Sequence, residues 1–265
     1  MMIAQSVRFL LLPLLLCCSP ARADCPPNST IADWVFGGKL CQAATTFGAE
    51  TAGASPTLIV VVHGDISDGG RATYHVAFAK TLQRPGTVVV ALTRPGYTDD
   101  RGRASEGHTY RRRDNYTRDN IAGVGGAIAA LRAHYRPRRV IFVGHSGGAA
   151  IGGVLIARMP RLIDAAVLVS CPCDIARWLS ERKKPPWPAS LSPLDYAGRV
   201  PRDTRVAVIA GSTDTNTFAA QAEDYVRALA RRGVDARFVQ VEGGGHGLST
   251  LGAATAQAVE EFAHE

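Results

Sequence analysis

The sequence predicts an α/β fold: a doubly wound, mostly parallel sheet with helices on both faces and a short lid segment. Apolar runs without alternation, such as residues 57–62, are typical of strands buried on both faces. These runs alternate with helical patterns along the chain, which is the order that a parallel sheet requires. The 265 residues are enough for one such domain, and no internal repeat or low-complexity linker divides them.

The first 23 residues have the pattern of a signal peptide. Arg8 supplies the positive end, residues 9–16 form the apolar run, and Ala21-Arg22-Ala23 offers a small-residue cleavage site. We therefore expect residues 1–23 to be removed and residues 24–265 to form one α/β domain that is secreted or periplasmic.

No stretch of the sequence reaches the roughly 20 apolar residues that cross a bilayer, so no stable membrane insertion is expected. A lipid anchor on Cys17 is disfavoured, because Leu16 is bulky where such a site needs a small residue. The formal charge is +7, and without Arg8 and Arg22 of the leader it is 7 − 2 = +5. A basic charge favours acidic partners, but no recognition motif or set of stacking aromatics indicates nucleic-acid binding.

Four cysteines follow the leader: Cys25, Cys41, Cys171 and Cys173. An even number in an oxidising compartment indicates disulfides, and a bond between Cys25 and Cys41 would fasten the N-terminal segment to the domain. The sequence leaves the connectivity open. A zinc site at Cys171 and Cys173 is a weaker alternative, because no second pair of ligands stands nearby.

The N-terminal part of the domain predicts edge strands followed by buried ones. Residues 25–55 are rich in Gly, Thr and Ala and suit short edge strands or loops. A buried strand over 57–62 ends in His63-Gly64-Asp65, and after a helix over 72–82 a second buried strand spans 87–92.

A charged, turn-rich loop over 98–118 comes next and contains Arg111-Arg112-Arg113. Asp119 or Asn120 is expected to cap the helix that follows, whose apolar residues recur at three- and four-residue spacing until Pro137 ends it. The sequence leaves two roles open for the arginine run: a solvated face, which is the usual role of charge runs, or contact with an anionic substrate.

The strand over 139–144 runs directly into a helix of small residues, with Ser146 at the corner. Such a turn holds its central residue in strained dihedrals and crowds the positions two before and two after it, which here are Gly144 and Gly148. The corner exposes the hydroxyl, and the new helix points its first N–H groups and its positive dipole end toward an oxyanion formed beside it. This context predicts that Ser146 is a nucleophile.

The rest of the chain predicts three more strands and their helices. Strands are expected over 165–169, 205–210 and 235–241, with a helix over 218–232 that ends at Gly233 and a final helix that carries Leu251, Ala254, Ala258 and Phe262. Residues 175–202, rich in Pro, Lys and Trp, are too few for a domain and enough for a lid. Trp178 and Trp187 of this segment would line a substrate pocket or pack against the core.

Two polar residues that follow later strands complete a constellation with Ser146. A serine hydroxyl needs a base, and His246 lies in a glycine-rich turn after the last predicted strand. Asp214, after the preceding strand, is placed to hold the imidazole's tautomer, and Asp174 is the alternative acid. Reactive loops gather at the carboxyl ends of parallel strands, where all of these residues lie.

In the order of Ser146, Asp214 and His246 the chain resembles the α/β-hydrolase family over essentially all of residues 24–265. The stretch from Ser192 to Ala197, together with Gly211 to Asp214 and Gly245-His246, is similar to the prolyl-oligopeptidase branch, although no propeller domain accompanies these residues.

The resemblance implies that His63-Gly64-Asp65 is the oxyanion element, with the backbone N–H groups of Asp65 and Gly147 forming the oxyanion hole. A carboxylate beside the hole would oppose the negative charge that develops there. We therefore expect the Asp65 side chain to point away from it.

The expected activity is that of a serine hydrolase that cleaves carboxylic ester bonds through an acyl-enzyme and needs no metal or organic cofactor. Its partner would be a small-molecule ester or peptide substrate. A serine peptidase of the prolyl-oligopeptidase type is the first alternative, and a non-catalytic binding protein with the same fold is the second. The sequence leaves the oligomeric state open.

Overall fold

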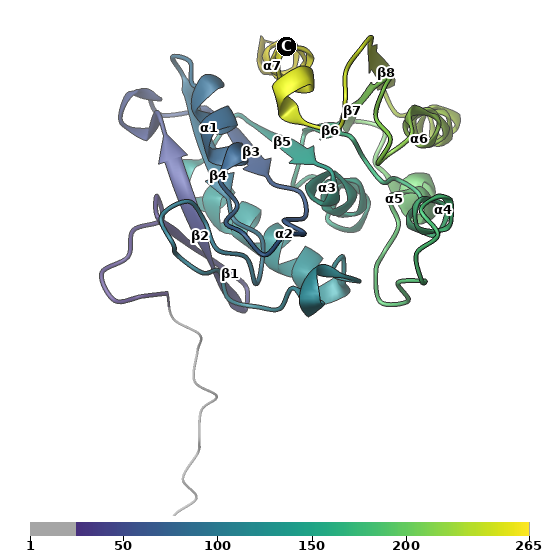
Figure 1. Ribbon diagram of the computed structural model, residues 1–265. Helices are drawn as coiled ribbons and strands as arrows, with labels where there is room; N and C mark the ends of the chain where they lie inside the picture. The colour runs from purple at the N-terminus through teal and green to yellow at the C-terminus, as the bar shows by residue number, and fades with distance from the viewer. Residues whose placement is uncertain (1–24, 265) are drawn as a thin grey trace, which may run out of the picture.

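The computed structural model describes residues 25–264, so the predicted signal peptide lies outside the described residues. The strands are β1 (Trp34–Gly37), β2 (Leu40–Phe47), β3 (Thr57–Val62), β4 (Thr87–Leu92), β5 (Arg139–His145), β6 (Ala165–Val169), β7 (Arg205–Gly211) and β8 (Ala236–Val241). They form one eight-stranded sheet in the order β1-β2-β4-β3-β5-β6-β7-β8 (Figure 1). β2 pairs antiparallel with β1 and β4, and the other neighbouring strands are parallel.

The helices lie on both faces of this sheet. They are α1 (Tyr74–Thr81), α2 (Arg118–Tyr135), α3 (Gly147–Arg158), α4 (Ile175–Glu181), α5 (Pro193–Tyr196), α6 (Ala219–Arg232) and α7 (Leu248–His264), with short 3-10 turns η1 (Ala49–Thr51), η2 (Tyr110–Arg112) and η3 (Ala197–Arg199). α1 and α7 cover one face, and α2, α3 and α6 cover the other (Figure 1).

Alternate residues of the central strands belong to two hydrophobic clusters. Leu58, Val60 and Val62 of β3 pack in the cluster under α2, α3 and α6, whereas Ile59 and Val61 pack in the cluster under α1 and α7. Both faces of the strand are buried, which explains why its apolar run does not alternate. The predicted fold class, a doubly wound and mostly parallel sheet, is confirmed.

The helix ends show where local sequence signals succeed and where they fail. Thr117 caps α2, rather than the expected Asp119 or Asn120, because its side-chain oxygen accepts the backbone N–H of Asn120 at 3.3 Å. Asp119 instead lies in the first turn of the helix. The predicted end of α6 is confirmed at Gly233, which has a φ of 81° that favours glycine.

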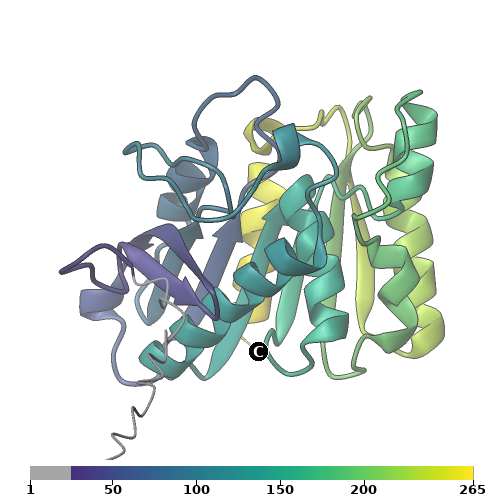
Figure 2. The same ribbon diagram turned by 90° about the horizontal axis from the view of Figure 1, so that it is seen from below.

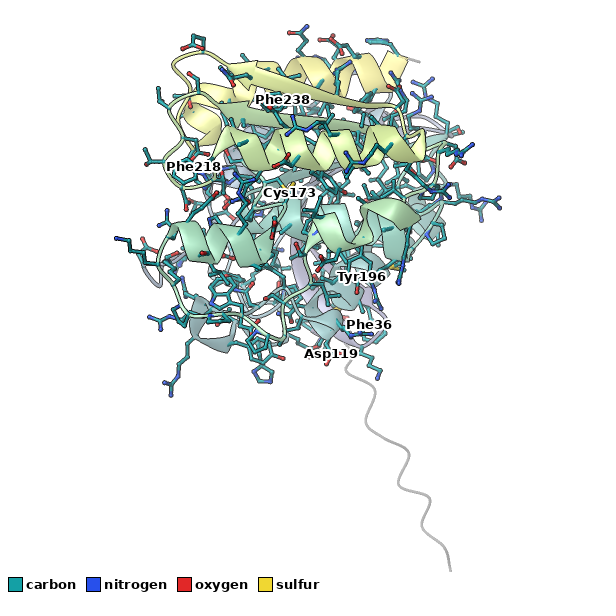
Figure 3. All side chains as sticks on the ribbon, turned by 90° about the vertical axis from the view of Figure 1, so that its right-hand side faces the viewer. Phe36, Asp119, Cys173, Tyr196, Phe218 and Phe238 are labelled. Atoms are coloured by element: carbon teal, nitrogen blue, oxygen red, sulfur yellow. A yellow bond between two sulfur atoms is a disulfide. The ribbon has the colours of Figure 1, made fainter. Side chains whose placement is uncertain are left out.

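Two disulfides settle the connectivity that the sequence left open. Cys25 and Cys41 are bonded, with 5.2 Å between their Cα atoms, and this bond ties the start of the described chain to β2. Cys171 and Cys173 are bonded across Pro172, and both are buried; Figure 3 shows Cys173 between α6 and the segment that contains α4 and α5. The zinc alternative at these two cysteines is therefore wrong, because their sulfurs bond to each other.

The segment 175–202, expected as a lid, contains the short helices α4 and α5, η3 and an irregular loop around Lys184. Trp178 and Leu179 of α4 are buried against the core, so this part of the segment is fixed by packing. Among residues 25–264, no helix has the length and apolar character needed to cross a bilayer.

The fold brings distant loops to one edge of the sheet. The loops that follow β3, β4, β6 and β8 gather at the carboxyl ends of the parallel strands, along the upper edge in Figure 2. This edge is where open α/β sheets place their ligands.

Candidate active site

Ser146 lies at the corner between β5 and α3 with φ 52° and ψ −117°, a conformation that is rare for a residue with a side chain. Its backbone N–H donates to the Val169 carbonyl at 2.8 Å, which holds the corner against β6. A Cβ at Gly144 would lie 2.5 Å from the Gly148 carbonyl oxygen, and one at Gly148 would collide with the Val62 carbonyl. The tight turn therefore needs glycine at both of these positions.

The structure brings the three predicted residues Ser146, His246 and Asp214 into contact. His246 Nε2 lies 3.1 Å from Ser146 Oγ, and His246 Nδ1 lies 2.8 Å from Asp214 Oδ2. The Asn216 amide nitrogen also lies 3.1 Å from Nε2 and can donate to it. Because both the hydroxyl and the amide donate to an unprotonated Nε2, the neutral ring carries its proton on Nδ1, facing the carboxylate.

The Asp214 carboxylate is held by the turn that follows β7. Its Oδ1 accepts the backbone N–H groups of Asn216 at 2.8 Å and Thr217 at 3.0 Å, and the Thr217 hydroxyl donates to Oδ2 at 2.7 Å. Burial opposes ionisation, but the hydrogen bonds from His246 and Thr217 outweigh it and hold the pKa of Asp214 well below its ordinary value. The carboxylate is thus anionic at neutral pH and faces the imidazole.

The alternative acid, Asp174, does not reach the imidazole. Its side chain accepts the backbone N–H of Arg177 at 3.1 Å and caps the N-terminus of α4. This is the usual role of an aspartate directly before a helix. Of the two acids considered from the sequence, the structure places Asp214 at the histidine.

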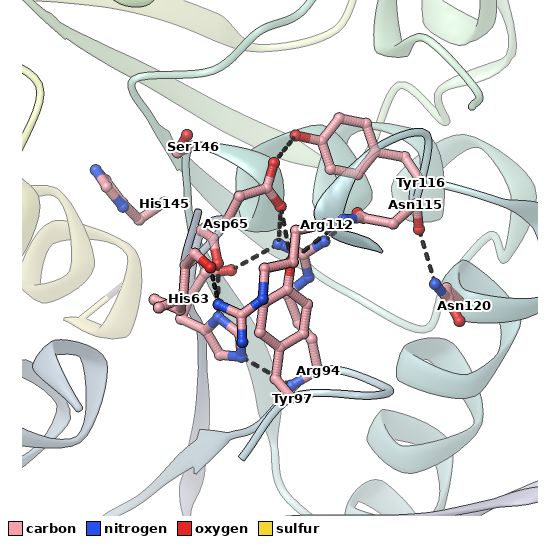
Figure 4. Close-up of polar contacts among 12 residues, drawn as sticks. His63, Asp65, Arg94, Tyr97, Arg112, Asn115, Tyr116, Asn120, His145 and Ser146 are labelled. Carbon is pink, nitrogen blue, oxygen red and sulfur yellow. Dashed lines mark hydrogen bonds and ion pairs between the residues drawn. The ribbon is translucent and has the colours of Figure 1, made fainter. Parts of the chain in front are cut away.

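Asp65 lies three residues after the end of β3, in an extensive polar network that Figure 4 shows. Its Oδ1 accepts from Arg94 at 2.8 Å and from the Tyr97 hydroxyl at 3.3 Å, and its Oδ2 accepts from the Tyr116 hydroxyl at 2.7 Å. The Asn115 side-chain oxygen accepts a second bond from Arg94 at 2.6 Å. The buried guanidinium and the carboxylate therefore neutralise each other.

This network corrects the expectation for the Asp65 side chain in part. The carboxylate turns toward Arg94, yet it does not leave the start of α3, because a Cβ at Gly147 would lie 2.8 Å from Asp65 Oδ1 and 2.8 Å from Arg94 Nη1. The side chain stays near the expected oxyanion position, and a buried cation compensates its charge. The sequence carried a hint of Arg94, a charged residue two positions after a buried strand, whereas nothing pointed to Tyr116.

His145 and Tyr74 connect the loops that surround Ser146. His145 Nε2 lies 2.8 Å from the backbone oxygen of His246, so it donates there and leaves Nδ1 as an acceptor for the Tyr74 hydroxyl at 2.7 Å. The Tyr74 oxygen in turn accepts the Gly64 N–H at 2.5 Å. Burial lowers the pKa of His145 to about 4, so the ring stays neutral and the chain of bonds is preserved.

His63 has a similar structural environment. Its Nε2 accepts the backbone N–H of Arg94 at 3.0 Å, and its Nδ1 lies 2.7 Å from the Gly64 carbonyl. Burial lowers the pKa of His63 well below its ordinary value. The ring is therefore neutral and ties the loop after β3 to the loop after β4.

A cavity of about 460 Å³ opens at Ser146 and His246. Trp178 and Trp187 of the segment 175–202 form one of its walls, and the Trp178 indole N–H donates to the Asn216 carbonyl at 2.9 Å. Within residues 25–264, no cluster of three or more His, Cys, Asp or Glu side chains could hold a metal ion. The residues at the cavity can instead supply a nucleophile, a base and a carboxylate partner for that base.

Known proteins share this architecture. The model of the prolyl oligopeptidase family matches residues 74–265, and none of the curated proteins matches the chain. Esterase PE8 is 22% identical with a TM-score of 0.58, and the match covers 83% of this chain and 98% of that one. Est1E from Butyrivibrio proteoclasticus, solved with ferulic acid, is 13% identical with a TM-score of 0.65, and the match covers 86% and 98%.

A Mycobacterium tuberculosis puromycin-hydrolyzing peptidase is 20% identical with a TM-score of 0.67, and the match covers 83% of this chain. It covers only 36% of the peptidase, so the chain spans about a third of that protein. At these identities the likeness to the solved structures shows the fold.

Proposed function

The chain belongs to the prolyl oligopeptidase family of α/β-hydrolase serine hydrolases, and from this premise we propose that it is an exported enzyme that cleaves carboxylic ester bonds. Ser146 is the nucleophile, His246 the general base and Asp214 the group that orients the base. The observation that carries the proposal is the unbroken chain from Ser146 Oγ through His246 to Asp214, with contacts of 3.1 and 2.8 Å.

Acylation begins when Ser146 Oγ attacks the ester carbonyl carbon and His246 Nε2 takes the hydroxyl proton. The imidazolium that forms is stabilised by the Asp214 carboxylate at Nδ1. When the tetrahedral intermediate collapses, the bond to the alcohol oxygen breaks and His246 returns the proton to the leaving alcohol. A positioned base of this kind contributes about 10²–10⁴-fold to the rate.

The carbonyl oxygen becomes negative in the tetrahedral intermediate. We assign its stabilisation to the backbone N–H groups of Asp65 and Gly147, with Gly147 being the first residue of α3. A helix N-terminus favours negative charge, and removing one oxyanion donor typically costs about 10²–10³-fold in turnover. The pairing of Asp65 with Arg94 supports this role, because it removes the carboxylate's repulsion of the oxyanion.

Deacylation repeats the same steps with water. His246 Nε2 takes a proton from a water molecule as the water oxygen attacks the acyl carbon. When this second tetrahedral intermediate collapses, the bond between the acyl carbon and Ser146 Oγ breaks and His246 returns the proton to Oγ. The products are a carboxylic acid and the free enzyme. Both stages use the side chains of Ser146, His246 and Asp214 together with the backbone N–H groups of Asp65 and Gly147.

An ester is favoured over a peptide because the matched esterases, PE8 and Est1E, are covered over 98% of their own length, against 36% of the matched peptidase. Peptidase activity is the second candidate, since the family is named for prolyl oligopeptidase. A panel of p-nitrophenyl esters of increasing acyl length, measured beside Pro- and Ala-blocked peptide amides, decides between the two. Faster cleavage of the amides would overturn the ester assignment.

The triad itself is tested by labelling the purified protein with a fluorophosphonate probe. Labelling is expected to disappear in Ser146→Ala and to slow strongly in His246→Ala, whereas Asp174→Asn should label like the wild type because Asp174 only caps α4. Undiminished labelling of Ser146→Ala would reject the nucleophile.

Export and the lid belong to the same proposal. Residues 1–23 are removed on export, so mass spectrometry of the exported protein should find an N-terminus at Asp24.

The segment 175–202 borders the cavity through Trp178 and Trp187 and acts as its lid. Tryptic cleavage after the exposed Lys183 should slow once the probe occupies the cavity, and an unchanged cleavage rate would contradict the lid.

A further inference from the structure

The cavity at Ser146 has an unusually cationic lining. Five cationic side chains line it, from two separate stretches of the chain: Arg111, Arg112 and Arg113 after β4, and Arg182 and Lys184 after α4. Asp65 is the one carboxylate in the lining that the structure describes, and its charge is already balanced by Arg94 at 2.8 Å. A cleft walled by one sign of charge concentrates ligands of the opposite sign.

Most of these cations have no protein partner for their charge. Within the described chain, the side chains of Arg111, Arg113 and Lys184 make no hydrogen bond or ion pair, and all three residues are exposed to solvent. Arg112 differs, because its guanidinium donates to the carbonyl oxygen of Ile66 and lies 5.6 Å from the centre of the Tyr97 ring. Arg112 therefore anchors the arginine run, and its two neighbours are left to face the cavity.

The backbone of the arginine run is strained. Tyr110, Arg111 and Arg112 have φ angles of 47°, 56° and 62°, in the left-handed region that residues with side chains rarely adopt. Such strain persists where the surrounding structure enforces it, and it concentrates at functional sites. Here the Arg112 bond to the loop after β3 is one contact that enforces it.

The stretch of the lining that follows α4 combines cations with aromatic rings. Trp178 and Trp187 lie with their ring centres 5.3 Å apart in an edge-to-face arrangement, and the Arg182 guanidinium lies 6.0 Å from the Trp178 ring. Arg182 also donates to the Thr215 carbonyl at 3.4 Å, next to the turn that carries Asp214. The cavity thus offers apolar surface beside positive charge.

We infer that the substrate is an ester that carries a negatively charged group, such as a carboxylate, on its acyl or its alcohol part. Arg111, Arg113 and Lys184 bind this group, while Trp178 and Trp187 contact the apolar body of the substrate. This inference rests on the proposed ester hydrolysis at Ser146 and names its substrate class. Guanidinium groups suit it because they bind carboxylates through two parallel hydrogen bonds.

The test compares charged esters with neutral esters of nearly the same shape. Mono-p-nitrophenyl adipate and its methyl ester place the charge on the acyl side, and 4-acetoxybenzoate and its methyl ester place it on the leaving group. A charged hydrogen bond contributes about tenfold or more in binding, so we expect kcat/KM, corrected for hydroxide hydrolysis, to be at least about tenfold higher for the charged member of one pair. This preference should shrink as salt is raised, because the cations are exposed.

Variants identify the residues. Arg113→Gln and Lys184→Gln should each lower kcat/KM for the charged ester several-fold and leave that for its methyl ester within about twofold. Arg231→Gln is the matched control, because this exposed arginine lies in the last turn of α6, about 18 Å along the helix axis from the first residue of that helix, and does not line the cavity. This variant should leave kcat/KM unchanged for both the charged ester and its methyl ester.

The outcomes separate the two proposals. Equal kcat/KM for the charged and neutral members of both pairs, or a preference that persists in the Arg113→Gln, Lys184→Gln double variant, overturns the anionic substrate and leaves ester hydrolysis intact. Failure of all four esters in a protein whose Ser146 still reacts with fluorophosphonate also overturns it. Failure of both the esters and the probe would instead refute the proposed function.

Discussion

Acid should destabilise this protein through buried histidines, and His75 provides the sharpest test. His75 of α1 is fully buried, and neither of its ring nitrogens has a hydrogen-bond partner among the described residues. Burial lowers its pKa from 6.5 to about 3, against a small opposing effect of Asp99. His63 and His145 are also held neutral by burial, but they make hydrogen bonds at the site, so substituting them would disturb more than charge.

The sign and the size follow from the two pKa values of His75. Below pH 6.5 His75 is protonated in the unfolded chain, whereas in the folded protein it stays neutral until the pH nears 3. The free energy of unfolding therefore falls as the pH is lowered through this window. At about pH 5 the loss from His75 is about 1.5 pH units × 1.36 kcal/mol, or about 2 kcal/mol. His145, with a pKa of about 4, adds a loss of similar size at that pH.

The perturbation is His75→Leu, which removes the titrating group and two unpartnered polar atoms without adding much volume. The free energy of unfolding in urea, followed by tryptophan fluorescence, should fall by about 2 kcal/mol less in the variant than in the wild type between about pH 8 and pH 5. His134→Gln, on the exposed face of α2, should leave the acid dependence unchanged, since water reaches that side chain in both states. Parallel pH profiles for the wild type and His75→Leu would refute the reasoning.

Three further outcomes follow from the site and the disulfides. Asp214→Asn should lower kcat by about 10³–10⁴-fold, because the His246 ring loses the partner that fixes its tautomer, and a loss below tenfold would point to another acid. Tyr74→Phe should lower kcat about tenfold with little change in KM, because it leaves His145 and the oxyanion loop each without a buried hydrogen-bond partner; an equal rise in KM would indicate a binding role instead. Cys25→Ser should lower the free energy of unfolding by about 3 kcal/mol for a loop of this length, and Cys41→Ser should lower it by the same amount; a stability equal to that of the wild type would show that the bond does not form.

The sheet and the corner at Ser146 could be predicted from the sequence because each depends on residues that are close together in the chain. The five consecutive apolar residues 58–62 show no alternation, which is typical of a strand buried on both faces of a covered parallel sheet, and β3 (Thr57–Val62) includes all five. The corner at Ser146 was equally readable, since glycines at 144 and 148 leave room that any side chain would fill. The exact start of α2 was not, because Thr117, Asp119 and Asn120 can all cap a helix and the chain path before it decides among them.

The network behind the site depends on distance between strands, which no local pattern encodes. Arg94 and Tyr116 lie 29 and 51 residues from Asp65 along the chain, yet both contact its carboxylate. The sequence exposed the problem, a carboxylate next to the expected oxyanion hole. Its solution required the parallel pairing of β3 with β4, which places the residues after these strands side by side. The position of Arg111 to Arg113 at the cavity could not be predicted for the same reason, because it depends on contacts between distant segments, and a charge run by itself is typical of a solvated face.

The bonds of Tyr74 and His145 make the loops of the site act as one unit. The Gly64 N–H, one residue before the expected oxyanion donor, is held by Tyr74, and the backbone of His246 is held by His145. Tyr74 and His145 are themselves joined by a hydrogen bond of 2.7 Å between the tyrosine hydroxyl and the imidazole. A displacement of the histidine loop therefore strains the oxyanion loop, so the base and the oxyanion donors keep their positions relative to Ser146. Because the link needs a neutral His145, burying that ring serves the geometry of the site as well as the core.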